Sequence, residues 1–87
     1  MELKDSVSII TGGASGLGEA TARKFHSLGS KVCIFDLDNL RGKNLEQELG
    51  ENCVYFSVDV CNEPDLVKAI NAVMNRFNKI NINVIYY

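Results

Sequence analysis

Thr11-Gly12-Gly13-Ala14-Ser15-Gly16-Leu17-Gly18 carries glycines at the spacing of a turn that leads from a strand into a helix. The turn follows the apolar run Val7–Ile10 directly. Gly12 allows a tight turn out of the strand, Gly16 lets the backbone approach a phosphate, and Gly18 lets the helix pack on the strand. The free N–H groups and positive dipole end of the helix attract negative charge. The stretch therefore predicts a strand–turn–helix unit that binds phosphate groups.

An acidic residue closes the second apolar run. Asp36 ends the run Lys31–Asp36 and lies 18 residues after Gly18. A carboxylate at this place accepts hydrogen bonds from the hydroxyls of an adenosine ribose. Together with the glycine turn it predicts a dinucleotide site. The alternatives are a glycine-rich turn with no ligand and, for Asp36, a solvated loop acid.

Strand-like and helix-like segments alternate along the chain, with short connections. The predicted strands are Val7–Ile10, Lys31–Asp36, Cys53–Val58 and Ile80–Tyr86. Apolar residues at helical spacing between them are Leu17, Ala20, Thr21, Phe25 and Leu28, then Leu40, Leu45 and Leu49, and last Leu66, Val67, Ile70, Val73, Met74 and Phe77. The predicted helix ends are the caps Asp38 or Asn39 and Asn62, Pro64 in a first turn, and the stops Gly29, Gly50 and Asn78.

Strands that are joined by helices pair in parallel, with right-handed crossovers. We therefore predict an α/β fold of Rossmann-like, three-layer type, with a four-stranded parallel sheet in the order 3-2-1-4 and three helices. Residues 1–87 would form the N-terminal portion of a single such domain, which is incomplete because a doubly wound sheet has six strands.

Composition narrows the possible functions. The 87 residues carry a net charge of −2, which gives no basic surface for nucleic acid or an anionic membrane. No apolar stretch approaches the roughly 20 residues of a membrane span. Cys33, Cys53 and Cys61 lack metal-ligand spacing, and we expect three reduced thiols in an intracellular protein. His26 has no visible catalytic partners, so we expect a surface role or an interaction with a helix C-terminus.

Three motifs in register resemble the short-chain dehydrogenase/reductase family. They are the spacing T-G-x-x-x-G-x-G in the turn, Phe35-Asp36-Leu37 and Val58-Asp59-Val60. Within the family, Thr11–Ala22 and Leu49–Val54 are most similar to mitochondrial enzymes of lipid metabolism that act on 3-hydroxyacyl-CoA and hydroxysteroids. The resemblance implies an NAD-dependent oxidoreductase, with fatty acyl-CoA or steroid substrates for the full-length protein. It also implies that the full-length protein is a homotetramer. The implied location is mitochondrial, and the alternative is cytoplasmic.

The resemblance also assigns the residues that bind NAD. They are Gly12, Ser15, Gly16, Leu17, Gly18, Asp36, Asp59 and Val60. Ser15 and Leu17 match turn positions beside the cofactor, and Asp59 matches a residue near the adenine amino group. The alternatives are a turn hydroxyl bonded to its own backbone for Ser15 and a helix cap or turn residue for Asp59.

The catalytic residues of the family have no counterpart in the 87 residues. The family's serine and Tyr-x-x-x-Lys pair are absent, and Tyr86 and Tyr87 read as a strand end. We therefore expect no turnover by this chain alone, and the alternative function is a non-enzymatic product that binds NAD weakly.

Since codons for Val84-Ile85 can read as the start of an intron, we expect the tail Val84–Tyr87 to come from a retained intron or a gene-model error. A methyltransferase using S-adenosylmethionine also places an acid after its second strand, but the glycine spacing disfavours it.

Overall fold

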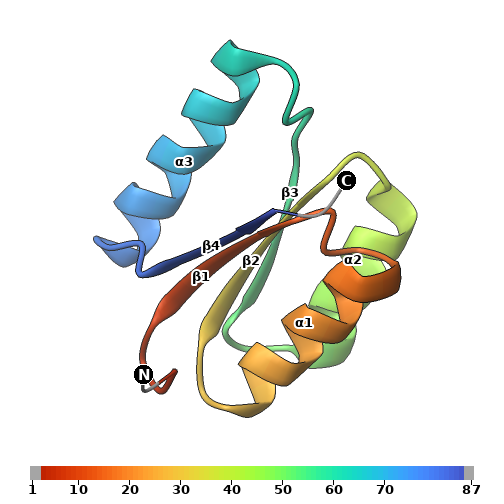
Figure 1. Ribbon diagram of the computed structural model, residues 1–87, viewed down its shortest axis with the longest axis vertical. Helices are drawn as coiled ribbons and strands as arrows, with labels where there is room; N and C mark the ends of the chain where they lie inside the picture. The colour runs from red at the N-terminus through yellow and green to blue at the C-terminus, as the bar shows by residue number, and fades with distance from the viewer. Residues whose placement is uncertain (1–2, 86–87) are drawn as a thin grey trace.

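The computed structural model describes residues 3–85, in which strands and helices alternate (Figure 1). The elements are β1 (Val7–Thr11), α1 (Gly16–Ser27), β2 (Lys31–Asp36), α2 (Asn39–Leu49), β3 (Cys53–Ser57), α3 (Glu63–Phe77) and β4 (Ile82–Ile85). None of the helices within this range has the length and apolar character needed to cross a membrane.

The four strands form one parallel sheet in the order β3-β2-β1-β4, which confirms the predicted topology. In β1, Ile10 pairs with Ile34 of β2 on one side and with Val84 of β4 on the other. Helices α1 and α2 cover one face of the sheet and α3 covers the other, so three layers result (Figure 1). Because the strands are parallel, their carboxyl ends meet at one edge of the sheet, where the glycine turn and Asp36 both lie.

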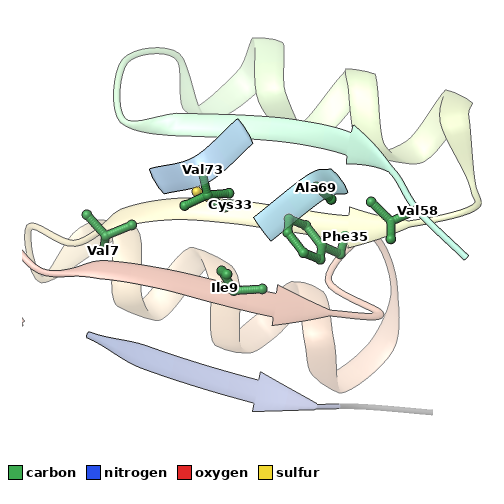
Figure 2. Packing of buried hydrophobic residues seen from close by; sticks show 7 residues of the cluster. All are labelled: Val7, Ile9, Cys33, Phe35, Val58, Ala69 and Val73. Atoms are coloured by element: carbon green, nitrogen blue, oxygen red, sulfur yellow. The ribbon is translucent and has the colours of Figure 1, made fainter. Parts of the chain in front are cut away.

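Alternate residues of the strands feed two separate cores, one on each face of the sheet. Figure 2 shows the core below α3, which consists of Val7, Ile9, Cys33, Phe35, Val58, Ala69 and Val73. The core below α1 and α2 consists of Ile10, Ala14, Ala22, Val32, Ile34, Leu45 and Cys53. Burial raises the pKa of Cys33 to about 12 and that of Cys53 to about 11, so both remain neutral thiols near pH 7.

The predicted apolar stripes of the helices are wrong in part. Leu17, Leu28, Leu40, Val67 and Met74 are all exposed. The buried residues of α1 are Gly18 and Ala22, neither of which belongs to the predicted apolar stripe. In α2 Gly42 is buried beside the predicted Leu45, and in α3 Ala69 is buried beside the predicted Val73. The additional buried positions carry glycine or alanine because the helices approach the sheet closely. The cores are also packed by larger predicted residues that are partly buried, namely Phe25, Leu49, Leu66, Ile70 and Phe77.

The predicted helix ends are confirmed. Asp38 and Asn62 accept hydrogen bonds from the N–H groups of Arg41 and Asp65, both at 3.1 Å. Gly29, Gly50 and Asn78 follow their helices with φ of 94°, 71° and 64°, in the left-handed region that ends helices.

The last strand is shorter than predicted. It begins at Ile82 rather than Ile80, and Ile80 packs against the core below α3. Asn81 exchanges backbone and side-chain hydrogen bonds with Val7, at 2.9 Å each. Tyr86, which was predicted to end this strand, and Tyr87 lie outside the described residues.

Candidate functional site at the carboxyl edge of the sheet

The glycine turn has the backbone that its sequence requires. Gly12 and Gly16 have φ of 67° and 57°, a region that side chains other than glycine rarely adopt. A Cβ atom on Gly18 would overlap the carbonyl oxygen of Gly12, so only glycine lets α1 pack this closely on the turn. A Cβ atom on Gly16 would meet nothing within 4 Å. The turn is therefore tight on its inner side and open on its outer side.

The first turn of α1 presents its N–H groups toward this open side. Ser15 precedes the helix in an extended conformation, with φ of −154°, and its side chain makes no capping hydrogen bond within the described chain. The first intrahelical bond runs from the N–H of Glu19 to the carbonyl oxygen of Ser15, at 3.2 Å. The N–H groups of Gly16, Leu17 and Gly18 precede it and have no acceptor within the helix. Such an N-terminus binds anions.

The structure brings Asp36 directly to the glycine turn. One carboxylate oxygen, Oδ2, accepts a hydrogen bond from the N–H of Ala14 at 3.1 Å, and the other accepts from the N–H of Asp38 at 3.0 Å. The N–H of Gly12 donates to the carbonyl oxygen of Phe35 at 2.8 Å, which joins the turn to β2 a second time. The acid and the turn therefore form one unit, although 22 residues separate Ala14 from Asp36.

Asp59 and Val60 lie after β3 at the same edge of the sheet. Asp59 Oδ1 accepts from the N–H of Cys61 at 3.0 Å, and the N–H of Asp59 donates to Asp65 Oδ2 at 2.7 Å. The structure thus gives Asp59 the turn role that was the alternative for it. Val60 is half-buried against the core below α3.

A cavity of about 210 Å³ adjoins Val60, and the sequence alone did not predict it. Its lining comes from β1, β2, α3, β4 and the loop after β3, and consists of Ile9, Thr11, Phe35, Val60, Cys61, Leu66, Ile70 and Asn83. The signal that could have found it is the alternation of Ile9, Thr11 and Phe35 onto the α3 face near the strand ends. A wider depression of about 720 Å³ follows the outer surface of α3, and its lining includes no residue of the glycine turn.

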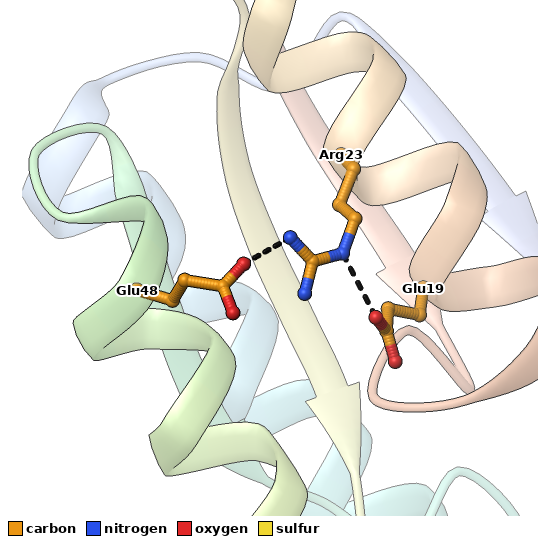
Figure 3. Close-up of polar contacts among 3 residues, drawn as sticks. All are labelled: Glu19, Arg23 and Glu48. Atoms are coloured by element: carbon orange, nitrogen blue, oxygen red, sulfur yellow. Dashed lines mark hydrogen bonds and ion pairs between the residues drawn. The ribbon is translucent and has the colours of Figure 1, made fainter.

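An ion-paired arginine links α1 to α2 beside the turn. Arg23 donates to Glu19 of its own helix at 2.8 Å and to Glu48 of α2 (Figure 3). The hydrogen bond to Glu48 is the main reason why the pKa of Arg23 is raised, and the same bond lowers the pKa of Glu48. These residues line a cavity of about 170 Å³ next to Ala14. Arg41, which also lines it, pairs with Asp38 at 3.5 Å.

Other kinds of site find no support in the described residues. Within residues 3–85, no three His, Cys, Asp or Glu side chains gather in a way that could hold a metal ion. His26 bonds through Nε2 to the carbonyl oxygen of Glu51 at 2.8 Å, which ties α1 to the loop before β3. All three cysteines are free, with Cys61 exposed.

Comparisons with known proteins agree with this geometry. The chain matches the family model of the short chain dehydrogenases over residues 6–85. It is 38% identical over 82 residues to 3-hydroxyacyl-CoA dehydrogenase type-2 of Drosophila melanogaster, covering 94% of this chain and 32% of that protein. It is 38% identical over 86 residues to zerumbone synthase of Zingiber zerumbet, covering 97% of this chain and 32% of that protein.

Solved structures give the same picture. The 3-ketoacyl-(acyl-carrier-protein) reductase of Brucella melitensis, complexed with NADH, superposes with a TM-score of 0.90 at 33% identity. That match covers 93% of this chain and 34% of the reductase. A short chain dehydrogenase of Bacillus anthracis superposes with a TM-score of 0.93 at 28% identity, covering 100% of this chain and 36% of the other. The chain thus spans about a third of the length of the proteins it matches.

Proposed function

The chain belongs to the short-chain dehydrogenase family, and we propose that it forms the part of an NAD-dependent oxidoreductase that holds the cofactor. The observation that supports this most directly is the hydrogen bond from the N–H of Ala14 to the carboxylate of Asp36. This bond holds a carboxylate beside a helix N-terminus, an arrangement that supports ribose binding by the acid and pyrophosphate binding by the helix.

The residues present fit the adenine, the adenosine ribose and the pyrophosphate of NAD. The N–H groups of Gly16, Leu17 and Gly18 would face the pyrophosphate, and the open side of Gly16 leaves room for it. Asp36 would accept hydrogen bonds from the ribose hydroxyls. Asp59 and Val60 would flank the adenine. When bound, NAD supplies a nicotinamide ring that accepts or gives up a hydride.

Charge at the ribose end favours NAD over NADP. The carboxylate of Asp36 would face a 2′-phosphate and repel it. Both arginines near Ala14 are already paired, Arg23 with two glutamates and Arg41 with Asp38. These carboxylate partners offset part of the charge that either arginine could direct at a phosphate.

For the whole protein we propose hydride transfer between nicotinamide and the alcohol carbon of a 3-hydroxyacyl-CoA or a hydroxysteroid. The similarity to 3-hydroxyacyl-CoA dehydrogenase type-2 supports this substrate class. A homotetramer and a mitochondrial location rest on the same similarity. The 87 residues contain no Tyr-x-x-x-Lys pair, so the chain alone would bind the cofactor and not turn over substrate. A non-enzymatic product with weak NAD binding is the second candidate.

Titration of the 87-residue chain with NAD and with NADP tests the proposal. We expect saturable binding of NAD and at least tenfold weaker binding of NADP. Equal affinity for the two would contradict the role of Asp36. Detectable oxidation of NADH by the chain with acetoacetyl-CoA would contradict the absence of catalysis and reject the non-enzymatic candidate.

A further inference from the structure

Tyr55, in the middle of β3, is hydrogen-bonded to the segment that carries Asp36. Its phenol oxygen lies 2.8 Å from the main-chain carbonyl oxygen of Asp36 and 2.6 Å from Oδ1 of Asn39, the first residue of α2. A phenol has a single proton, which these two acceptors share. One hydroxyl therefore connects the end of β2 to the beginning of α2.

The aromatic ring is held in place from several sides. It occupies the space beside Gly42, where a Cβ atom would overlap ring atoms of Tyr55. The backbone N–H of Tyr55 donates to Glu46 Oε2 at 2.7 Å, which fastens the same strand residue to α2. Burial raises the pKa of the phenol above its ordinary value of 10.0, so the hydroxyl remains a donor near pH 7.

The contacts of Tyr55 and those of the glycine turn meet at Asp36. The carbonyl oxygen of Asp36 accepts from the Tyr55 hydroxyl at 2.8 Å and from the N–H of Val58 at 3.2 Å. Its carboxylate accepts from the N–H groups of Ala14 and Asp38. A fixed carbonyl restricts rotation of the peptide unit that follows Asp36. Tyr55 pairs with Ile34, which lies two residues before Asp36 on β2. The direction of the Asp36 carboxylate thus depends on a residue of the neighbouring strand.

We propose that Tyr55 is a positioning residue for cofactor binding, whose hydroxyl fixes the main chain of Asp36 so that the carboxylate stays beside Ala14. The role rests on the proposed function, in which Asp36 holds the adenosine ribose. Gly42 shares in it because it makes room for the ring.

A double-mutant cycle for NAD binding tests this role. Tyr55→Phe keeps the ring and removes the hydroxyl, and we expect the affinity for NAD to fall about 2–12-fold, the usual range for one hydrogen bond. In the Asp36→Ala background the same change should have no further effect, because the group that Tyr55 positions is gone. An equal loss in both backgrounds would overturn the proposal.

Asn39→Ala is the matched control, since it removes the second acceptor of the phenol proton and leaves Asp36 and Ser57 beside the hydroxyl. We expect its affinity for NAD to stay within about twofold of the wild type, because the phenol proton then goes wholly to Asp36. A loss as large as that of Tyr55→Phe would show that the effect arises at the start of α2, and would overturn the proposal.

Hydrogen exchange at the amide of Ala14 gives a readout that needs no cofactor. We expect this amide to exchange faster in Tyr55→Phe, while the amide of Lys31, bonded to Ser6 at the other end of the sheet, keeps its rate. Unchanged exchange at Ala14, or equal acceleration at both amides, would overturn the positioning role.

Failure of the wild type to bind NAD would instead overturn the proposed function. If Tyr55→Phe failed to fold, Gly42→Ala, which displaces the ring and keeps the hydroxyl, would serve for the same exchange measurement.

Discussion

The two faces of the sheet are built on different principles. On the face of α1 and α2, the helices lie close to their neighbours because glycines have no side chain. Gly18 lies against the backbone of Gly12, and Gly42 lies against the ring of Tyr55. On the face of α3, side chains such as Val73 and Phe35 fill a core that leaves a cavity of about 210 Å³ near the strand ends. Backbone atoms have little freedom to adjust, whereas side chains can repack. The first face should therefore tolerate less change than the second.

Gly18→Ala should have the largest effect, because the new Cβ atom would meet a backbone carbonyl oxygen rather than a flexible side chain. We expect a loss of about 3 kcal/mol or more in the free energy of unfolding, at the upper end of overpacking costs. Urea denaturation followed by circular dichroism measures it. The control is Ala20→Gly on the exposed side of α1, which should cost about 0.5–1 kcal/mol. Similar losses for the two variants would show that α1 can move away from the turn.

Asp36→Ala should weaken NAD binding by about 1–3 kcal/mol, as expected for the loss of a charged hydrogen-bond acceptor. Calorimetric titration gives the value. Glu51→Gln, which removes a negative charge at the opposite edge of the sheet, should leave the affinity unchanged. If both variants lost affinity equally, general charge rather than the contact at the glycine turn would control binding.

Val73→Ala tests the face of α3, where Val73 is fully buried. We expect a loss of about 1.5–2 kcal/mol in the free energy of unfolding, because two methyl groups leave the core and the neighbouring side chains relax only in part. The control is Val67→Ala on the same helix, where the side chain is 49% exposed and the cost should stay below about 0.5 kcal/mol. Losses of 3 kcal/mol or more in Val73→Ala would show that this face is as intolerant as the other.

The same contrast explains what the sequence could and could not predict. The strand order, the helix ends and the nearness of the glycine turn to Asp36 were predictable, because glycine spacing, capping residues and parallel crossovers act locally or by simple topology. The buried faces of the helices were predictable only in part. Hydrophobic spacing found Leu45 and Val73, but it also favoured large residues such as Leu17 and Leu40, whereas close approach selects Gly18 and Gly42. Contacts between distant side chains, such as that of Tyr55 with Asn39, leave no periodic signal.

The ion pair between Arg23 and Glu48 should have the smallest effect of the four, because both side chains are well exposed to solvent and salt. Glu48→Gln removes the pair and keeps the size of the side chain. Because Arg23 lowers the pKa of Glu48 in the folded state, the pair stabilises the fold above the ordinary pKa of 4.5 and loses this effect as the pH falls below it. Thermal melts of the wild type and Glu48→Gln should therefore differ slightly at pH 7 in low salt and coincide at pH 3. A difference that persists at pH 3 or in 1 M salt would show that Glu48 joins α1 to α2 by packing rather than by charge.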